Sequence, residues 1–169
     1  MRNETLRTLQ AVMQRKQEVV LRARGYSMYP YILPEDICVF RPLYAGLKIG
    51  QVGLVVGESG IVYSHRLHRI DRVGSGIQYV FRGDTNGYFD KPVYRSQIVG
   101  VLSELRREEK TIRESAALRK CWSYIAARGR LALLPFAGAA RRKEVRAGGA
   151  APGRWELYGI GGSGGTFDS

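Results

Sequence analysis

The sequence predicts a mainly β domain with a short helix before it and a basic amphipathic helix after it. Short apolar runs separated by glycine- or proline-containing turns fill residues 18–105, which is typical of an antiparallel β domain. Helical periodicity is confined to the two flanks of that region. With 169 residues, of which 44% are hydrophobic, the chain can bury a core without disulfides or metals.

The predicted elements follow from these patterns. Apolar residues recur at helical spacing near the N-terminus and predict one helix within residues 1–17. The strand candidates are bounded by glycine or proline and lie at residues 18–24, 36–41, 50–56, 61–70, 77–81 and 97–102.

The C-terminal third has a different composition. We expect a basic helical appendage over residues 106–145, whose apolar face is Leu118, Cys121, Trp122 and Ile125. Such a helix can lie in a membrane interface or pack on the β domain, and the pattern fits both. Residues 146–169 are rich in glycine and are expected to be a disordered tail.

Charge and hydropathy narrow the partners and the compartment. The formal net charge is +12, and residues 111–154 contain ten basic residues and only two acidic ones. This density favours an anionic partner, such as a lipid surface, or serves as a solubilising face.

No run approaches the ~20 apolar residues needed to cross a bilayer, and the first residues lack the apolar region of a signal peptide. We therefore expect a cytoplasmic or peripherally membrane-associated protein. The two cysteines give no ligand pattern, so no metal or cofactor is expected.

Ser27 is the first candidate for chemistry. A serine becomes a nucleophile when a base removes its proton and the backbone exposes its oxygen. Gly25 permits a sharp change of backbone direction before it, and Pro30 stiffens the chain after it. A serine beside glycine is also a common turn residue.

Histidine is scarce in this chain. The two are His65 and His68, both within the strand candidate 61–70, where residues three apart point to opposite faces. One of them can therefore face a cleft. Because an ordinary imidazole pKa lies near 6.5, either suits general-base chemistry, although an ordinary strand histidine is the simpler interpretation of His68.

Two carboxylates lie downstream. Asp84 follows Gly83 after a strand candidate, and Asp90 lies six residues further on. A carboxylate that accepts a hydrogen bond from the far N–H of the imidazole would fix its tautomer. Either aspartate could do this, and Asp84 could instead be a turn residue that binds backbone N–H groups.

Together these segments resemble the signal peptidase I family, particularly its ER-type Ser/His branch, and the LexA-like peptidases that share its fold. The marks, in order, are Ser27–Pro30 (Ser-Met-Tyr-Pro), residues 34–37 (Pro-Glu-Asp-Ile), His65-Arg66, residues 82–86 (Arg-Gly-Asp-Thr-Asn), and residues 98–100 (Ile-Val-Gly). Their order and spacing agree with the family over roughly residues 20–102, about half of the chain.

The resemblance implies a serine endopeptidase on a LexA/signal-peptidase-like β domain. Ser27 would be the nucleophile and His65 the base. Asp90 would support His65, and Asp84 would be structural or accessory. The residues around the nucleophile would shape the oxyanion hole and the substrate-binding edge, namely Gly25, Tyr26, Met28 and Pro30.

The expected partner is an extended peptide or precursor protein, such as a leader or signal-like peptide. Peripheral contact with an anionic membrane is a further expectation, and nucleic acid is not favoured. Two alternatives stay open: a catalytically silent peptide-binding module, and a LexA-like regulator that cleaves itself.

Overall fold

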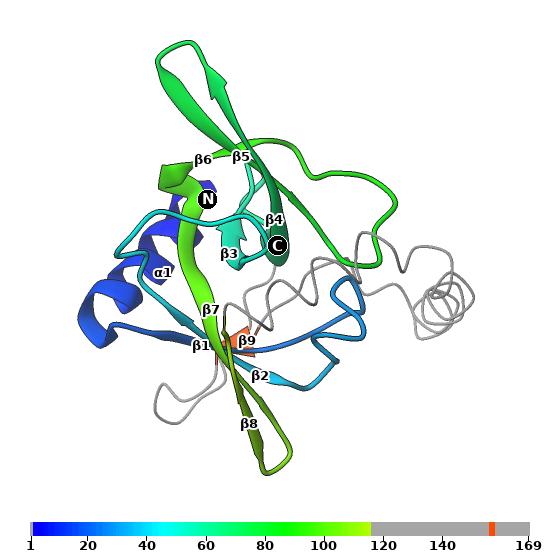
Figure 1. Ribbon diagram of the computed structural model, residues 1–169. Coiled ribbons are helices and arrows are strands. Elements are labelled where there is room, and N and C mark those ends of the chain that lie inside the picture. Colours follow the sequence, from blue (N-terminus) through cyan, green and yellow to red (C-terminus); the bar gives the residue numbers. More distant parts are fainter. Residues whose placement is uncertain (1, 116–155, 158–169) are drawn as a thin grey trace.

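The structure is a computed structural model that describes residues 2–115 and 156–157 (Figure 1). It contains one antiparallel sheet preceded by a single helix, α1 (Arg2–Lys16). The prediction of a mainly β chain with a short N-terminal helix is therefore confirmed.

Nine strands form the sheet within the described part of the chain. Their order across the sheet is β6-β5-β4-β3-β7-β2-β1-β9, and β8 pairs with β7 outside this path. The strand bounds are β1 (Val19–Arg22), β2 (Ile37–Arg41), β3 (Val52–Val56), β4 (Val62–Val73), β5 (Gly76–Arg82), β6 (Val93–Tyr94), β7 (Ile98–Arg107), β8 (Lys110–Arg113) and β9 (Glu156–Leu157), with a short 3-10 turn, η1 (Arg95–Gln97), before β7.

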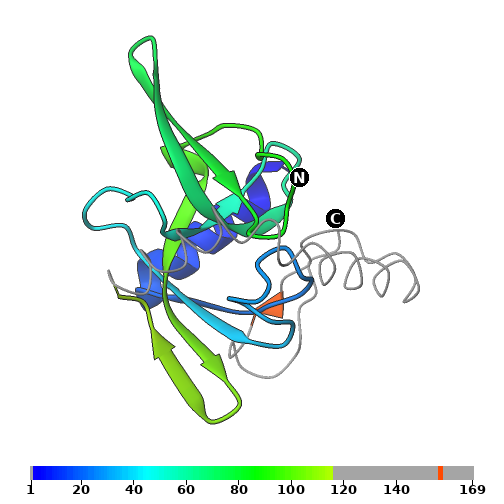
Figure 2. The same cartoon turned by 45° about the vertical axis from the view of Figure 1, so that its right-hand side comes forward.

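Register shifts bend this sheet. They interrupt the β2–β7, β3–β7 and β4–β5 pairings. A bulge increases the local twist and bends the strand that carries it, so a long sheet curls instead of lying flat. The long β4–β5 hairpin extends beyond the body at one end, and the β7–β8 hairpin extends at the other (Figures 1 and 2).

Two apolar clusters fill the curled sheet. The larger lies under α1, which contributes Leu9 and Met13, and it includes Val19, Leu21, Met28, Tyr31, Cys38, Phe40 and Leu54. The smaller contains Val55, Leu67, Tyr79, Phe81, Val93 and Ile98. The alternating burial of β1 shows how the sheet divides inward and outward positions, because Val19 and Leu21 are buried and their neighbours are not.

The strands continue beyond the predicted end of the β domain. The β domain does not end at residue 105, because β7 continues to Arg107 and β8 returns along it. Glu108 adopts a positive φ of 52° at the turn, and the β-branched Thr111 and Ile112 suit the returning strand. The start of the predicted appendage, residues 106–113, is thus a hairpin. In the tail that we expected to be disordered, β9 pairs with β1.

The predicted basic helix around Trp122 lies outside the described residues. In the part of the chain that the structure describes, no helix combines the length and the apolar character needed to span a membrane.

Gly100 offers a test of how closely α1 packs against the sheet. A Cβ at this position would lie 2.8 Å from the backbone oxygen of Arg41 and 2.5 Å from the terminal methyl of Met13. We expect Gly100→Ala to lower the free energy of unfolding by about 1–3 kcal/mol, because the backbone oxygen cannot move aside cheaply. Chemical denaturation measures this change. Gly46→Ala is the control, since a Cβ there meets nothing within 4 Å, and it should change stability by less than about 0.5 kcal/mol. Equal effects of the two substitutions would contradict the tight seating.

Candidate functional site

Ser27 lies in a tight turn between β1 and β2. Gly25 has a φ of 80°, a conformation that residues with a side chain rarely adopt, and it redirects the chain just before the serine. The turn closes through hydrogen bonds from the Tyr29 N–H to the Tyr26 carbonyl, at 3.0 Å, and from the Ile32 N–H to the Met28 carbonyl, at 3.0 Å. Met28 is only 4% exposed, so it anchors the turn in the larger core cluster instead of lining an open surface.

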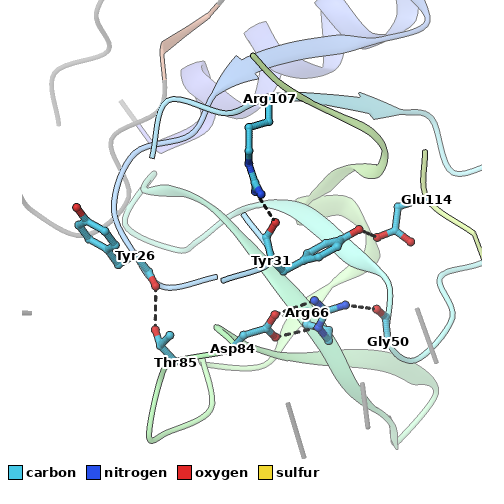
Figure 3. A network of polar contacts seen from close by, with 8 residues as sticks. All are labelled: Tyr26, Tyr31, Gly50, Arg66, Asp84, Thr85, Arg107 and Glu114. Atoms are coloured by element: carbon cyan, nitrogen blue, oxygen red, sulfur yellow. Dashed lines mark hydrogen bonds and ion pairs between the residues drawn. The ribbon is translucent and has the colours of Figure 1, made fainter. Parts of the chain in front are cut away.

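The segment after β5 holds this turn in place. The Thr85 N–H donates to the Ser27 carbonyl at 3.0 Å, and the Thr85 hydroxyl donates to the Tyr26 carbonyl at 3.0 Å (Figure 3). A Cβ on Gly83 would lie 2.7 Å from the Ser27 carbonyl oxygen. A side chain at position 83 would therefore push the serine turn away from the sheet. The Gly83-Asp84-Thr85 segment is thus a docking platform for the nucleophile candidate.

His65 and Asp90 form the second part of the site. The Nδ1 atom of His65, on β4, lies 2.6 Å from Oδ2 of Asp90, and both side chains are largely buried. The Asp90 backbone N–H donates to the Phe81 carbonyl at 2.9 Å, which fixes the carboxylate beside the sheet. The Tyr63 ring packs near the imidazole, with 5.0 Å between ring centroids. Burial, and then the nearby Asp90 charge, raise the pKa of Tyr63, so its hydroxyl stays neutral.

Asp84 contacts a different partner. Its two carboxylate oxygens accept hydrogen bonds from Nε and Nη2 of Arg66, at 2.8 and 2.7 Å. Nη1 of Arg66 donates to the Gly50 carbonyl at 2.9 Å (Figure 3). The side chains are 1% and 4% exposed, so this is a fully buried ion pair. Of the two carboxylates that the sequence left open, Asp90 contacts the imidazole and Asp84 does not.

Tyr31 connects the serine turn to this ion pair. Its ring lies under the Arg66 guanidinium, whose central carbon is 5.0 Å from the ring centroid. Its hydroxyl donates to Glu114, and its carbonyl accepts from Arg107 at 3.1 Å (Figure 3). Burial and the bond to Glu114 raise the pKa of Tyr31. Burial alone would lower the pKa of Arg66, but the hydrogen bonds and charge of Asp84 outweigh it and raise the pKa.

The His65–Asp90 and Arg66–Asp84 contacts start from two adjacent residues of β4. His65 and Arg66 point to opposite faces of the strand because they are adjacent. The β4–β5 pairing ends at Arg66 and Arg82, so the chain leaves β5 at Gly83 on the side of His65. A Cβ on Gly83 would meet the Ser27 carbonyl, so the serine turn lies against the segment that follows this last pair. The serine turn and the imidazole thus approach the same region. Among the described residues, the Ser27 hydroxyl makes no hydrogen bond to His65.

His68 occupies the β4 bulge, where the register with β5 shifts. Its ring packs edge-on against Phe89, with centroids 5.7 Å apart. Its Nε2 atom is buried and has no hydrogen-bond partner in the described part of the chain. Burial, and then the positive charge of Arg82, lower the pKa of His68. This histidine does not contact Asp90 or Ser27 through a hydrogen bond, so its role differs from that of His65.

A separate open hollow lies on the β7–β8 hairpin. Its volume is about 750 Å³, and it is lined by Glu104, Arg106, Thr111 and Arg113. None of these residues contacts Ser27 or His65. The hollow therefore does not belong to the candidate site.

Sequence reasoning missed the residues that hold the site together. Arg66, Tyr31 and Thr85 were named only as parts of motifs or not at all. The sequence pattern did not single out Arg66, because β4 also contains Arg69 and Arg72, which are exposed. Nothing in the sequence pattern pointed to Tyr31 as the residue under Arg66, since that contact joins segments distant in the chain.

No protein-family model matches this chain, and no curated protein matches it either. The site must therefore be interpreted from its own residues and their geometry.

The different partners of the two aspartates predict different effects on folding. Asp84→Ala leaves the Arg66 charge buried without its carboxylate, so we expect the free energy of unfolding to fall by about 3–5 kcal/mol. Asp71→Ala is the matched control, because Asp71 pairs with Arg69 on the surface, and it should cost less than about 1 kcal/mol. Urea denaturation followed by circular dichroism measures both. If Asp84→Ala were as mild as the control, the buried pair would not support the fold.

The lowered pKa of His68 predicts a pH dependence of stability. The unfolded chain binds a proton on His68 near pH 6.5, whereas the folded chain resists it. The contribution of neutral His68 to the free energy of unfolding is therefore fully present above that pH. It is lost as the pH falls toward the folded-state pKa. Between about pH 7.5 and about pH 5.5, the unfolding free energy of His68→Gln should fall less than that of the unaltered chain. A parallel decline in both proteins, measured by denaturation at each pH, would refute this assignment.

Proposed function

We propose that this chain is a serine endopeptidase in which Ser27 is the nucleophile, His65 the general base and Asp90 the residue that orients His65. The single observation that supports it most is the 2.6 Å contact between His65 Nδ1 and the Asp90 carboxylate. That contact lies beside the segment to which the serine turn is docked. The chain resembles the signal peptidase I family in the same residues.

The contact determines what the imidazole can do. When Nδ1–H donates to Asp90, the lone pair of the neutral ring is on Nε2, which is the atom that must accept a proton. Ser27 Oγ then attacks a peptide carbonyl carbon while its proton passes to Nε2. The proton moves on to the leaving amine as the C–N bond breaks. Water, deprotonated by the same nitrogen, hydrolyses the acyl-enzyme and releases Ser27.

The backbone around Ser27 suits the developing negative charge. The Thr85, Tyr29 and Ile32 N–H groups are used to hold the turn. The Ser27 N–H donates no hydrogen bond to another backbone group among the described residues, so it is available to an oxyanion. The Ser27–His65 hydrogen bond itself would form when substrate binds, since catalytic hydrogen bonds are often long in free enzymes.

The proposed substrate class is an extended leader or precursor peptide. A sheet edge beside a turn binds such a segment through its main chain, as a β-strand addition. The five marks of the resemblance fall on the serine turn, at the start of β2, on β4, at the end of β5 and on β7, which supports a LexA/signal-peptidase-like fold. The net charge of +12 supports the further proposal of peripheral contact with an anionic membrane.

A catalytically silent peptide-binding module is the second candidate. The observation in its favour is that the Ser27 hydroxyl and His65 share no hydrogen bond in the described residues. The two functions differ in one measurable way, because a silent module binds peptides without producing new termini.

Cleavage of a proteome-derived peptide library, analysed by mass spectrometry for new N-termini, tests the proposal. We expect Ser27→Ala and His65→Ala each to reduce cleavage by at least about 10³-fold, because each removes a member of one proton-transfer unit. Asp90→Asn should reduce it by roughly 10- to 10⁴-fold, since the imidazole loses the partner that fixes its tautomer.

Ser59→Ala is the matched control, because Ser59 is an exposed serine in the turn between β3 and β4. It should leave cleavage unchanged. A second readout is covalent labelling by a fluorophosphonate, which should add mass at Ser27 and not at Ser59. A folded chain that neither cleaves the library nor takes up the label would reject the peptidase proposal and favour the silent module.

A further inference from the structure

The outer edge of β1 is occupied by a distant segment of the same chain. β1 pairs with β2 on its inner side, and β9 pairs antiparallel on its other side, with Leu21 opposite Leu157 and Arg22 opposite Glu156 (Figure 2). Without β9, β1 would be the terminal strand of the sheet and would present unpaired N–H and C=O groups. Such an edge is a template for any extended segment.

This edge leads directly to the nucleophile candidate. β1 ends at Arg22, and the chain continues through Ala23, which bonds to the backbone of Glu35 and Asp36, to the Gly25 bend and then Ser27. A peptide that adds to β1 as a strand therefore runs alongside the segment that ends in the serine turn.

The β9 pairing is small. It comprises two register positions, and residues 116–155 separate it in sequence from the end of the preceding described segment. Each main-chain hydrogen bond adds little net stability, and closing a long connection costs entropy. The buried side chains of β1, Val19 and Leu21, point into the core, so recognition at this edge depends on the main chain. A substrate strand would make the same kind of hydrogen bonds as β9.

We propose that β9 is a built-in competitor that covers the substrate-binding edge of β1 and must leave before an extended peptide can bind there. This inference rests on the proposed function, because it assigns the regulation of the same site. β9 is held by a few main-chain hydrogen bonds and is displaced by a peptide that makes more of them. The chain thereby restricts cleavage to peptides that are long and extended enough to replace its own strand.

The experiment uses the full chain with Glu156→Pro and Leu157→Pro together. Proline cannot donate a ladder hydrogen bond and disfavours pairing on both sides of an edge strand. Thr166→Pro is the matched control, because it introduces a proline nine residues beyond β9. Hydrogen exchange of the β1 amides reports directly on the pairing. We expect faster exchange in the double-proline chain and no change in the control.

Competition is measured with a fluorescent synthetic peptide that has the sequence of residues 152–161. In a Ser27→Ala background, it should bind the double-proline chain at least about tenfold more tightly than the chain with an intact β9, because the free edge is then the dominant state. With Ser27 present, the double-proline change should lower KM for library peptides and leave kcat unchanged.

Unchanged hydrogen exchange, or equal peptide affinity in both chains, would overturn the proposal. The exchange and binding measurements do not require catalysis. If no variant cleaves any peptide, the peptidase assignment fails. The competition proposal is then still decided by the exchange and binding measurements.

Discussion

The buried ion pair between Arg66 and Asp84 is the constraint on which the arrangement of the site depends. Moving two charges out of water costs more than their attraction returns unless the geometry is good and the remaining donors are satisfied. Here the contact is bidentate, the third guanidinium nitrogen of Arg66 donates to the Gly50 carbonyl, and the Tyr31 ring covers the guanidinium. The pair thus restricts the segment after β5 to one position.

The ion pair also sets the position of the Ser27 turn, although it acts through neighbouring residues and not by direct contact with Ser27. Asp84 sits between Gly83, which leaves space for the serine turn, and Thr85, which binds the turn through its N–H and hydroxyl. Fixing Asp84 therefore fixes the platform under Ser27. Tyr31 adds a second connection, because it belongs to the chain that leaves the turn and packs against the same guanidinium. A network built for stability in this way determines where the proposed nucleophile is placed.

A single strand also separates the proposed general base from the arginine of the buried ion pair. His65 and Arg66 are neighbours on β4, and strand alternation sends them to opposite faces, each to its own aspartate. Asp90 and Asp84 are thereby distinguished by partner and by burial. The pairing of β1 with β9 likewise has two consequences. It completes the sheet, and it covers the edge where we propose that an extended peptide adds.

Much of the fold could be predicted from sequence because it depends on local patterns. Strand candidates bounded by glycine and proline gave the β domain, and helical spacing of Leu9 and Met13 gave α1. The β7–β8 hairpin was missed because helical and strand periodicities are hard to separate in a short charged segment. The β9 pairing was missed because nothing local in a glycine-rich region indicates a distant partner strand.

For the site, the sequence by itself determined the residue types that chemistry needs: one serine in a glycine-bent turn, a histidine on a strand and two nearby aspartates. Only the tertiary structure decided which aspartate meets the imidazole, which one neutralises Arg66, and which surface the serine turn rests on. The physical reason is that a hydrogen bond requires about 3 Å and a defined direction. Contacts between residues 18 or more positions apart are therefore set by strand register, bulges and packing, and the order of residues along the chain does not specify them.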